Sequence, residues 1–591
     1  MRELNGENFF YKILAGLNRV IREEKHLNDI NFFPVPDGDT GTNLALTSSS
    51  IMQNCRPHQS LSLTSRAIAD AAFRGARGNA GLIMAQYLKG LSDSFTGKVA
   101  VNVRDYSAAV KKAVSVTYNS VINPVEGTIL TVMRHWSECL NSLIDEVDDF
   151  KKLFTGSLKS AQEALSGTMN RIKVLQKNRV VDAGGKGFVL FLQGILDFLE
   201  KGHRIDPLEY HPPEPSGDHH PDILPENISH RFCSQLVLDR PRLDRGSLIA
   251  RLRELGDSLI IGGDADRFKI HIHTNHPDLL TEELMEEGDI QDPVVDDMLL
   301  QSLSRQEKRP VALVTDSACD LPRKLMDEYR IHLVPITIFH RSHTFLDKLT
   351  LRPSTLYRML DSYRDAPVSS QPNVQTFENL YRSLLPRYRR IVSFHLSAAL
   401  SGTFNSARLA AENVDPSRIT VVDSTSISTA LGLQVLRIAR AIRDRQSWPS
   451  LEQQLRHLPG RGVIYVSVRN LKYMVRGGRV SPLKGLLARI LNLTPIISLD
   501  REGKSCLIGK AFGFDANLRK MKSMVLEKAR EPGILEYAIG HVNNPQTARS
   551  LGEDLQRMIG KKPVYITDVS PLIGMHAGPG SVSVSLVENP G

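Results

Sequence analysis

The chain has 591 residues, of which 41% are apolar and 24% charged, and its formal net charge is +9. At about 100–200 residues per domain, this length predicts three to five domains. The composition excludes collagen-like and intrinsically disordered chains. No uninterrupted apolar run of about 18 residues occurs, so we predict no membrane-spanning helix. The first residues lack the apolar core of a signal peptide, and we therefore expect a cytoplasmic protein.

The net charge limits the classes of binding partner, and the cysteines indicate the redox state of the thiols. Five scattered cysteines without a CxxC pair predict reduced thiols rather than a disulfide framework. The positive charge fits a polyanionic partner, such as a nucleic acid or a nucleotide, or a plain basic surface. Because no block of five or six Lys and Arg residues occurs, we predict no nucleic-acid partner.

Residues 1–206 have a helical pattern. Apolar residues recur at helical spacing in SRAIADAAFRGA (65–76) and around Val110 and Val114, and GFVLFLQGILDFLE (187–200) has the same pattern. Polar, glycine-rich loops separate these segments, and binding residues are commonly found on such loops. We predict a helical domain whose loops carry the chemistry.

The next segment, 207–225, reads PLEYHPPEPSGDHHPDILP. Its six prolines predict a linker, and its three histidines leave a metal-binding tract as the alternative. Residues 226–301 predict a small α+β domain with a helix in GSLIARLRELG and strands in DSLIIGG and RFKIHIHT. Residues 310–591 alternate strands and helices, which predicts an α/β fold with a largely parallel sheet and ligands at the carboxyl ends of its strands.

The first candidate site lies in NFFPVPDGDTGTN, residues 31–43. Asp37 and Asp39 flank Gly38, and Thr40, Gly41, Thr42 and Asn43 follow at the start of a predicted helix. Neighbouring carboxylates repel each other, and oxygen ligands of this kind suit Mg²⁺ bound to nucleotide phosphates. An Asx turn that caps the helix is an equal alternative. The spacing alone leaves both interpretations open.

Two further loops, GARGNAG (75–81) and DAGGKG (182–187), each precede a predicted helix. Backbone N–H groups at a helix start favour phosphate. Neither loop is a P-loop, and no GxGxxG follows a strand, so glycine content alone is a weak signal.

Taken in order, NFFPVPDGDTGTN, GARGNAGLIMAQ, NPVEGTILTVMR (123–134) and VVDAGGKGF (180–188) resemble the nucleotide-binding domain of dihydroxyacetone-kinase type found in bacterial fatty acid kinases. This resemblance implies an all-helical barrel that binds ATP through two Mg²⁺ ions. Asp37 and Asp39 would be metal ligands, with Asn31 as a third. Ala80 stands where the family usually has Ser, and the loss of that hydroxyl would reduce turnover. The residues implied around the nucleotide are Thr40, Gly41, Thr42, Asn43, Asn79, Gly81, Asp182, Gly184 and Gly185.

A second candidate site contains Cys233, in RFCSQLVL, and His271 and His273, in KIHIHTN. On a strand, residues i and i+2 face the same way. Two imidazoles and a thiolate suit Zn²⁺, which would still need a fourth ligand. The alternative is a half-buried strand with solvated histidines. The segment also resembles the middle domain of the kinase component of fatty acid kinases, and that resemblance implies zinc at these three residues.

The third candidate site is a series of hydroxyl-rich loops after 310. VTDSACDLP (314–322) follows a strand, as expected of a loop at the ligand end of a sheet, and SSQPN (369–373), HLSAALSGTFNSA (395–407), LKYMVRGGRVSP (471–482) and GMHAGPG (574–580) come later. Helix N-caps at Ser369 and Ser401 and a turn at GPG are the simpler alternatives. In this order the loops resemble the DegV family of fatty-acid-binding proteins. That resemblance implies that Ser369 and Ser401 bind the acyl carboxylate and that His576 lies beside it.

Together the resemblances imply an ATP-dependent kinase that phosphorylates a fatty acid carboxylate, giving acyl phosphate and ADP, with Mg²⁺ and ATP required and Zn²⁺ as a further metal. Such a carboxylate is already ionised at pH 7 and needs no general base. It needs charge neutralisation at the γ-phosphate. The alternatives are a non-catalytic lipid-binding protein with a nucleotide-sensing domain, which Ala80 favours, and a kinase of a small polyol such as dihydroxyacetone. The partners considered are a long-chain fatty acid, an acyl-phosphate acceptor enzyme, a second copy of the chain and a transient membrane contact.

Overall fold

The computed structural model describes residues 1–34, 36, 38–202, 228–306, 309–362, 365–476, 493–531 and 534–588. Asp37, the predicted linker at 207–225 and residues 477–482 of the glycine-arginine motif lie outside these residues. The chain divides into two compact units. Unit 1 is Met1–Pro277 with Glu286–Gln306, and unit 2 is Asp278–Met285 with Glu307–Gly591.

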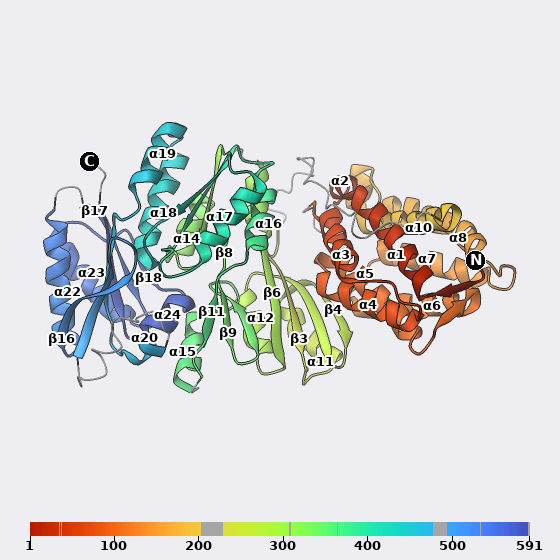
Figure 1. The fold of residues 1–591 in the computed structure, drawn as a ribbon, viewed down its shortest axis with the longest axis horizontal. Coiled ribbons are helices and arrows are strands. Elements are labelled where there is room, and N and C mark those ends of the chain that lie inside the picture. Colours follow the sequence, from red (N-terminus) through yellow and green to blue (C-terminus); the bar gives the residue numbers. More distant parts are fainter. Residues whose placement is uncertain are drawn as a thin grey trace. The chain divides into compact units, whose positions relative to one another are not determined.

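The first part of unit 1 is a helical domain, coloured red to yellow in Figure 1. The helices predicted at 65–76, around Val110 and at 187–200 are confirmed; the closed barrel stays a prediction. Trp136 lies in the core between Phe154 and Phe188, because the apolar faces of the helices turn inward. The elements are β1 (Glu3–Asn5), α1 (Gly6–Arg22), α2 (Glu24–Asp29), α3 (Thr40–Asn54), α4 (Leu61–Gly75), α5 (Gly78–Ser94), β2 (Ala100–Asn102), α6 (Val103–Ser120), α7 (Ile129–Ser142), α8 (Phe150–Arg171), α9 (Lys173–Asn178) and α10 (Ala183–Lys201).

The second part of unit 1 is an antiparallel sheet in the order β4-β5-β3-β6. The predicted helix and both predicted strands are confirmed. The sheet packs on the helical domain: Ile260 joins that domain's core, and the Gly263 N–H donates to Gln86 Oε1 over 2.9 Å. The elements are β3 (Phe232–Asp239), α11 (Arg245–Leu252), β4 (Gly256–Asp264), β5 (Arg267–Thr274), β6 (Asp289–Asp297) and α13 (Met298–Gln306). The intervening helix α12 (Pro277–Leu284) lies in unit 2 from Asp278 onward.

Unit 2 has the predicted α/β fold, but the prediction of a largely parallel sheet is wrong, because most of its strand pairs are antiparallel. A parallel sheet, β13-β12-β7-β8, is present. A six-stranded sheet, β16-β15-β14-β19-β17-β18, is antiparallel except for its β17–β18 pair. A third, antiparallel sheet has the order β10-β9-β11. Alternating strands and helices predicted parallel pairing, but β14 pairs with β19, which follows it by more than a hundred residues.

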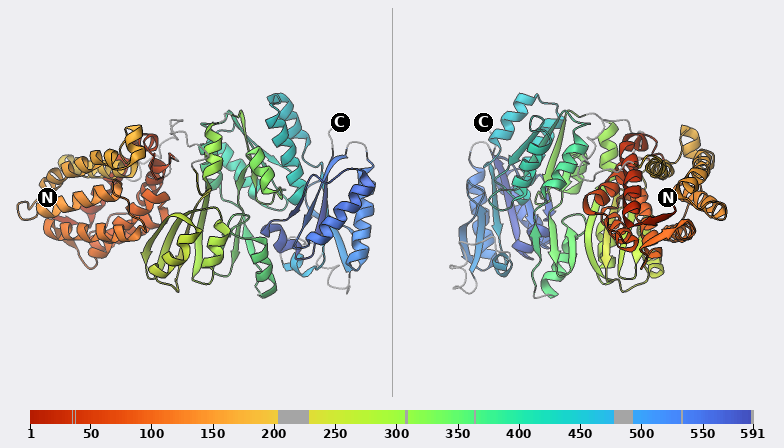
Figure 2. Two further views of the ribbon diagram at one scale, coloured as in Figure 1. Left: turned by 180° about the vertical axis from the view of Figure 1, so that it is seen from behind. Right: turned by 45° about the vertical axis from the view of Figure 1, so that its right-hand side comes forward.

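The helix α18 separates the two larger sheets of unit 2, since it packs on β14, β17 and β19 and also reaches β7 (Figure 2). The strands are β7 (Val311–Asp316), β8 (His332–Val334), β9 (Thr337–His340), β10 (His343–Leu346), β11 (Val368–Ser370), β12 (Arg390–His395), β13 (Ile419–Asp423), β14 (Gly462–Ser467), β15 (Leu493–Leu499), β16 (Ser505–Phe512), β17 (Ile534–His541), β18 (Ile566–Asp568) and β19 (Val582–Glu588). The helices are α14 (Arg323–Tyr329), α15 (Pro353–Ser362), α16 (Val374–Leu384), α17 (Thr403–Val414), α18 (Ser428–Arg443), α19 (Trp448–His457), α20 (Lys472–Arg476), α22 (Phe514–Ala529), α23 (Pro545–Ile559) and α24 (Pro571–Ala577). Among the described helices, none combines the length and apolarity needed to cross a bilayer.

Candidate functional site

In the helical domain, Asp39 lies in the loop before α3. It occupies the N-cap position of this helix, yet its side chain makes no capping hydrogen bond to α3, every residue of which the structure describes. The alternative of a capped turn is therefore not seen at Asp39. Asn31 is buried, and its Oδ1 accepts a hydrogen bond from Thr40 Oγ1 over 2.5 Å.

Thr42 is held by helix α2. Its backbone N–H donates to Asn28 Oδ1 over 3.1 Å, and its hydroxyl donates to Glu24 Oε1 over 2.8 Å. Gly41 lets the two helices approach this closely, because a Cβ there would lie 2.1 Å from the Glu24 carbonyl oxygen. The contacts seen for Thr42 and Gly41 are therefore contacts with helix α2, and they fix the start of α3 against that helix.

The glycine-rich loop before α5 lies against the start of α3. Gly78 has a φ of +56°, and a Cβ at this position would lie 2.2 Å from Asn43 Nδ2. Gly81 likewise packs on Thr47, whose hydroxyl accepts the Arg77 N–H over 3.4 Å. The predicted residues of the two loops are thus brought together.

The third loop joins the same end of the domain. Asp182 caps α10 by accepting the Gly185 N–H over 2.7 Å, and it also accepts the Ile129 N–H at the start of α7. Burial raises the pKa of Asp182 to about 6, against the lowering effect of these two bonds. Gly184 packs on Ile129, and Gly187 packs on Leu44 of α3. The carboxylate of Asp182 is therefore used to join helices.

Four helix starts, those of α3, α5, α7 and α10, meet at this end through these contacts. Each contributes backbone N–H groups and the positive end of a helix dipole, which favours anions such as phosphates. Asn79, in the first turn of α5, has a buried Oδ1 that finds no hydrogen-bond partner among the described residues. This end of the domain therefore places N–H groups and helix dipoles, which favour anions, near the Asp39 loop.

In the middle sheet, Cys233, His271 and His273 form a cluster on one face. Their ligand atoms lie within 4.8 Å of one another, and all three residues are buried. Cys233 Sγ is 3.8 Å from His271 Nδ1. Burial holds the pKa of His271 well below its ordinary value, which favours the neutral imidazole that metals bind. Because both histidines are buried, the alternative of a strand with solvated histidines does not hold.

Asp257 supports the cluster from the neighbouring strand. It pairs with His273 in the sheet register, and its Oδ1 lies 3.4 Å from His273 Nδ1. Hydrogen bonding to His273 lowers the pKa of Asp257 below its ordinary range. Carboxylates that accept the second ring N–H of a ligating histidine are a regular feature of zinc sites.

The cluster faces the helical domain. Lys269 precedes His271 on the same face of β5, and its Nζ donates to the carbonyls of Phe73 and Arg74 over 2.8 and 3.2 Å. Burial, with Arg77 nearby, lowers the pKa of Lys269 to about 7. Asp296, which pairs with Cys233, has Arg77 and Asp39 as charged neighbours. The Cys/His cluster therefore borders the loops that carry Asp39 and Arg77.

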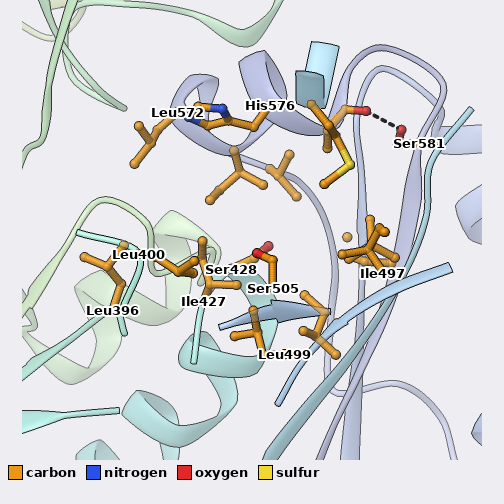
Figure 3. Close-up of a pocket in the computed structure, with 18 of the residues that line it drawn as sticks. Leu396, Leu400, Ile427, Ser428, Ile497, Leu499, Ser505, Leu572, His576 and Ser581 are labelled. Carbon is orange, nitrogen blue, oxygen red and sulfur yellow. Dashed lines mark hydrogen bonds between the residues drawn. The ribbon is translucent and has the colours of Figure 1, made fainter. Parts of the chain in front are cut away.

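In unit 2, a cavity of about 330 Å³ lies between the end of β12 and the six-stranded sheet. Figure 3 shows Leu396, Leu400 and Ile427 facing Leu572 and His576 across it. Ser369, Ser401 and His576 all line this cavity, so all three predicted lipid residues are brought together. A largely apolar space with hydroxyls at its wall suits a fatty acid.

Ser369 and Ser401 reach the cavity from different elements. Ser369 lies in β11, and Asn373 caps the following helix, so the N-cap alternative does not hold for Ser369. Ser401 Oγ accepts the Thr403 N–H over 3.3 Å at the start of α17, so this residue also supports a helix start. Gln371 touches Gly402 and links the two segments.

Several polar residues of the cavity wall were not predicted from the sequence, among them Gln371, Ser428 and His541. Gln371 lies inside the quoted SSQPN motif, but its contact with Gly402 depends on the packing of two distant loops. Ser428 begins α18, and His541 ends β17, where its Nδ1 lies 3.3 Å from Asp568 Oδ1. The position of His541 at a strand end was the one signal that could have found it.

Three family models match the chain in succession. The first is the DAK2 domain at residues 34–197, and the second is the middle domain of FakA-like fatty acid kinase proteins at 229–305. The third is the uncharacterised DegV family at 310–589. The chain thus joins a helical DAK2 domain, a FakA-like middle domain and an α/β DegV domain in one polypeptide, as the motifs predicted.

Curated relatives match part of the chain. Protein YloV of Bacillus subtilis is 31% identical over 325 residues, which cover 52% of this chain and 59% of the relative. An uncharacterized protein of Staphylococcus epidermidis is 29% identical over 289 residues, which cover 46% of this chain and 52% of the relative. The chain therefore spans a little over half the length of these relatives.

Solved structures match the DegV part. One concerns fatty acid binding by a DegV family protein from Thermus thermophilus; it is 28% identical and covers 47% of this chain and 99% of that chain, with a TM-score of 0.43. Another is DegV, a fatty acid binding protein from Bacillus subtilis, which is 25% identical and covers 48% of this chain and 100% of that chain, with a TM-score of 0.44.

Proposed function

We propose that this chain is an ATP-dependent fatty acid kinase that holds the acid in its DegV domain and phosphorylates it with its DAK2 domain. One observation carries the proposal: a chain with a DAK2 domain also holds an apolar cavity whose wall includes Ser369, Ser401 and His576. The acid's hydrocarbon chain would fill the apolar part, and the serine hydroxyls would donate to its carboxylate.

The reaction needs positioning more than proton transfer. A carboxylic acid with a pKa of about 4–5 is ionised at pH 7. A carboxylate oxygen forms the new bond to the γ-phosphorus, while the bond from that phosphorus to its bridging oxygen breaks and its electron pair leaves with ADP. No proton moves. Neutral hydroxyls at Ser369 and Ser401 would hold the carboxylate and leave its negative charge available for attack. A cation at the same place would neutralise that charge and make the carboxylate a weaker nucleophile.

The residues present fit magnesium, which the fold family implies. Asp39 leaves its carboxylate free of capping bonds to the described helix α3, and the buried Asn31 would offer a second oxygen donor. Asp37 lies outside the described residues, and its role as a third ligand stays a prediction. Bound Mg²⁺ would offset phosphate charge. The backbone N–H groups of the loops at Gly78 and Gly184 would orient the triphosphate, with Asn43 and Asn79 beside it. Joining donor and acceptor in one chain raises their effective concentration to about the millimolar range.

The experiment is an acyl-phosphate trapping assay on the full chain with ATP, Mg²⁺, a long-chain fatty acid and hydroxylamine. The expected result is acyl hydroxamate that depends on both ATP and the acid. Hydroxamate formation no greater than in a reaction without ATP would refute the kinase.

Ala80 favours a second candidate, a lipid-binding protein that senses nucleotide without turnover. Ala80 is buried in the first turn of α5 and offers no hydroxyl to a phosphate. The same assay separates the candidates, because a sensor would bind ATP and fatty acid and form no hydroxamate. Restoring the hydroxyl with Ala80→Ser would then tell whether this side chain is the cause.

We further propose that the cluster of Cys233, His271 and His273 binds zinc. A buried thiolate and two imidazoles are donors that suit Zn²⁺, and Asp257 would hold His273 in the tautomer that offers Nε2. Replacing Cys233 with Ser is expected to lower bound zinc from about one ion per chain to below about 0.3. Metal analysis of the purified chain measures this. Cys55→Ser, which removes another buried thiol, should retain the ion; equal zinc in both variants would contradict the assignment.

A further inference from the structure

The loop VTDSACDLP has no part in the function proposed so far, although it follows β7 at the ligand end of the parallel sheet. Among the described residues that line the cavity, none is an aspartate of this loop. Asp316 and Asp320 are buried, as is Asp347 at the end of β10. Each of these three carboxylates accepts a backbone N–H from a segment that does line the cavity or leads into its wall.

Asp320 holds two such segments. Its Oδ1 accepts the Ser570 N–H over 2.8 Å, and its Oδ2 accepts the Ser428 hydroxyl over 2.7 Å. Ser428 lines the cavity, and Ser570 is the N-cap of α24. Lys348 Nζ lies 3.2 Å from Asp320 Oδ1 and supplies a positive charge beside it.

Asp347 holds the first turn of α24. Its Oδ1 accepts the Leu572 N–H over 3.0 Å, and Leu572 lines the cavity. The N-terminus of α24 therefore meets two buried carboxylates, a favourable pairing of a helix dipole with negative charge. His576, in the last turn of the same short helix, projects toward the cavity in Figure 3.

Asp316 holds the opposite wall. Its Oδ2 accepts the Leu396 N–H over 2.9 Å and lies 3.0 Å from His395 Nδ1. Leu396 lines the cavity, and the chain runs from it to Ser401. The hub, defined as Asp316, Asp320, Asp347 and Lys348, thus contacts two of the three segments that carry the predicted head-group residues, namely those of Ser401 and His576.

The core of unit 2 buries three carboxylates here, and two of them, Asp320 and Asp347, have Lys348 as a charged neighbour. Removing charged groups from water is unfavourable unless partners in the protein compensate for the lost hydration. Apolar residues of similar volume would leave the bonded N–H and hydroxyl groups without an acceptor. What the carboxylates add is fixed direction, because each binds a particular N–H or hydroxyl.

We propose that Asp320 and Asp347 are positioning residues that set His576 and the start of α24 for recognition of the acid's carboxylate. The inference rests on the lipid-binding part of the proposed function. The two aspartates act through α24 and do not touch the lipid. They therefore govern the head group and leave binding of the hydrocarbon chain largely unchanged.

The test compares two ligands of equal chain length on the full-length chain, a long-chain fatty acid and the corresponding primary alcohol. Each competes against a fluorescent fatty acid. The wild type should prefer the acid. Asp347→Ala removes the acceptor for the Leu572 N–H and should reduce this preference by about tenfold, with the alcohol's affinity changed by less than about twofold.

Two variants serve as matched controls. Asp347→Asn keeps an oxygen that can accept the Leu572 N–H, and it should retain most of the preference for the acid. Asp415→Ala removes a carboxylate that also accepts a backbone N–H, in the turn between α17 and β13, and should leave the preference unchanged. Equal weakening of acid and alcohol by Asp347→Ala would show a merely structural role and overturn the inference.

If Asp347→Ala does not fold, Lys348→Met carries the test. It removes the positive charge beside Asp320, so the preference for the acid should again fall; an unchanged preference would overturn the inference. A wild type that shows no preference for the acid refutes lipid recognition in the proposed function. Acid binding without acyl-phosphate formation refutes the kinase and leaves the positioning role standing.

Discussion

Replacing Asp39 with Asn is expected to slow acyl-phosphate formation by about 10³-fold, which corresponds to about 4 kcal/mol of transition-state stabilisation. The reason is electrostatic: the amide keeps the size of the side chain but loses the charge that would hold Mg²⁺ at the γ-phosphate. Asp39 makes no capping bond to the described helix α3, so the helix loses no contact of that kind. The measurement is the hydroxylamine trapping rate at saturating ATP and fatty acid.

Asp70→Asn is the matched control, because it removes an exposed carboxylate from α4 in the same domain. It should leave the rate within about twofold of wild type, as surface substitutions usually do. Fatty acid binding by the Asp39 variant should also be unchanged, since the cavity lies in unit 2. A rate above about one tenth of wild type in the Asp39 variant would count against a metal role for this side chain.

The second large effect concerns the lipid. Ser401→Ala is expected to weaken binding of a long-chain fatty acid by about 10- to 150-fold, because a hydrogen bond to a charged group contributes about 1.5–3 kcal/mol. The Ser401 side chain lines the cavity, and removal of its hydroxyl leaves the carboxylate without that donor. Competition against a fluorescent fatty acid gives the affinity directly.

Ser401 also accepts the Thr403 N–H, so its loss costs some stability at the start of α17. Thermal unfolding of the same sample separates this effect from binding. Ser523→Ala removes an exposed hydroxyl from α22 and should change neither quantity. An affinity for the acid within about twofold of wild type in Ser401→Ala would place the carboxylate elsewhere.

The local pattern of apolar residues was sufficient to predict helices and strands whose periodicity is uninterrupted. The apolar residues of SRAIADAAFRGA and of GFVLFLQGILDFLE recur on one helical face, and the structure forms α4 and α10 there. RFKIHIHT alternates with the period of a strand and forms β5, with His271 and His273 on one face. In these segments the information lies within a few residues of chain.

The direction in which strands pair could not be predicted from such local patterns. β19, VSVSLVE, was not predicted as a strand, yet it lies between β14 and β17 and makes both pairs antiparallel. Its partners are set by which apolar faces can be buried together across the whole unit. The same limit applied to the cavity. Gln371 stood inside a quoted motif, but its contact with Gly402 exists only once two loops far apart in sequence have packed.

Charged residues were the hardest to assign. The placement of Asp182 beside a nucleotide stays a prediction, and the structure adds that its carboxylate joins the starts of α10 and α7. For Asp316 and Asp320 the sequence indicates only a place at the end of a strand. A sequence shows that a carboxylate is present; its hydrogen-bond partners decide whether it binds a ligand or holds the protein together.

The bond from Lys269 to the last carbonyls of α4 bears on how this chain can be dissected. A fragment that ends at residue 197, where the DAK2 match ends, would lack Lys269, so the last carbonyls of α4 would lose their hydrogen bonds to its ammonium group. It would also expose the part of the helical core that Ile260 covers. The loop with Arg77 follows directly, so its shape is completed by a strand encoded about two hundred residues later. We therefore expect the helical domain and its sheet to fold together, so a fragment defined by the DAK2 match alone should not fold by itself.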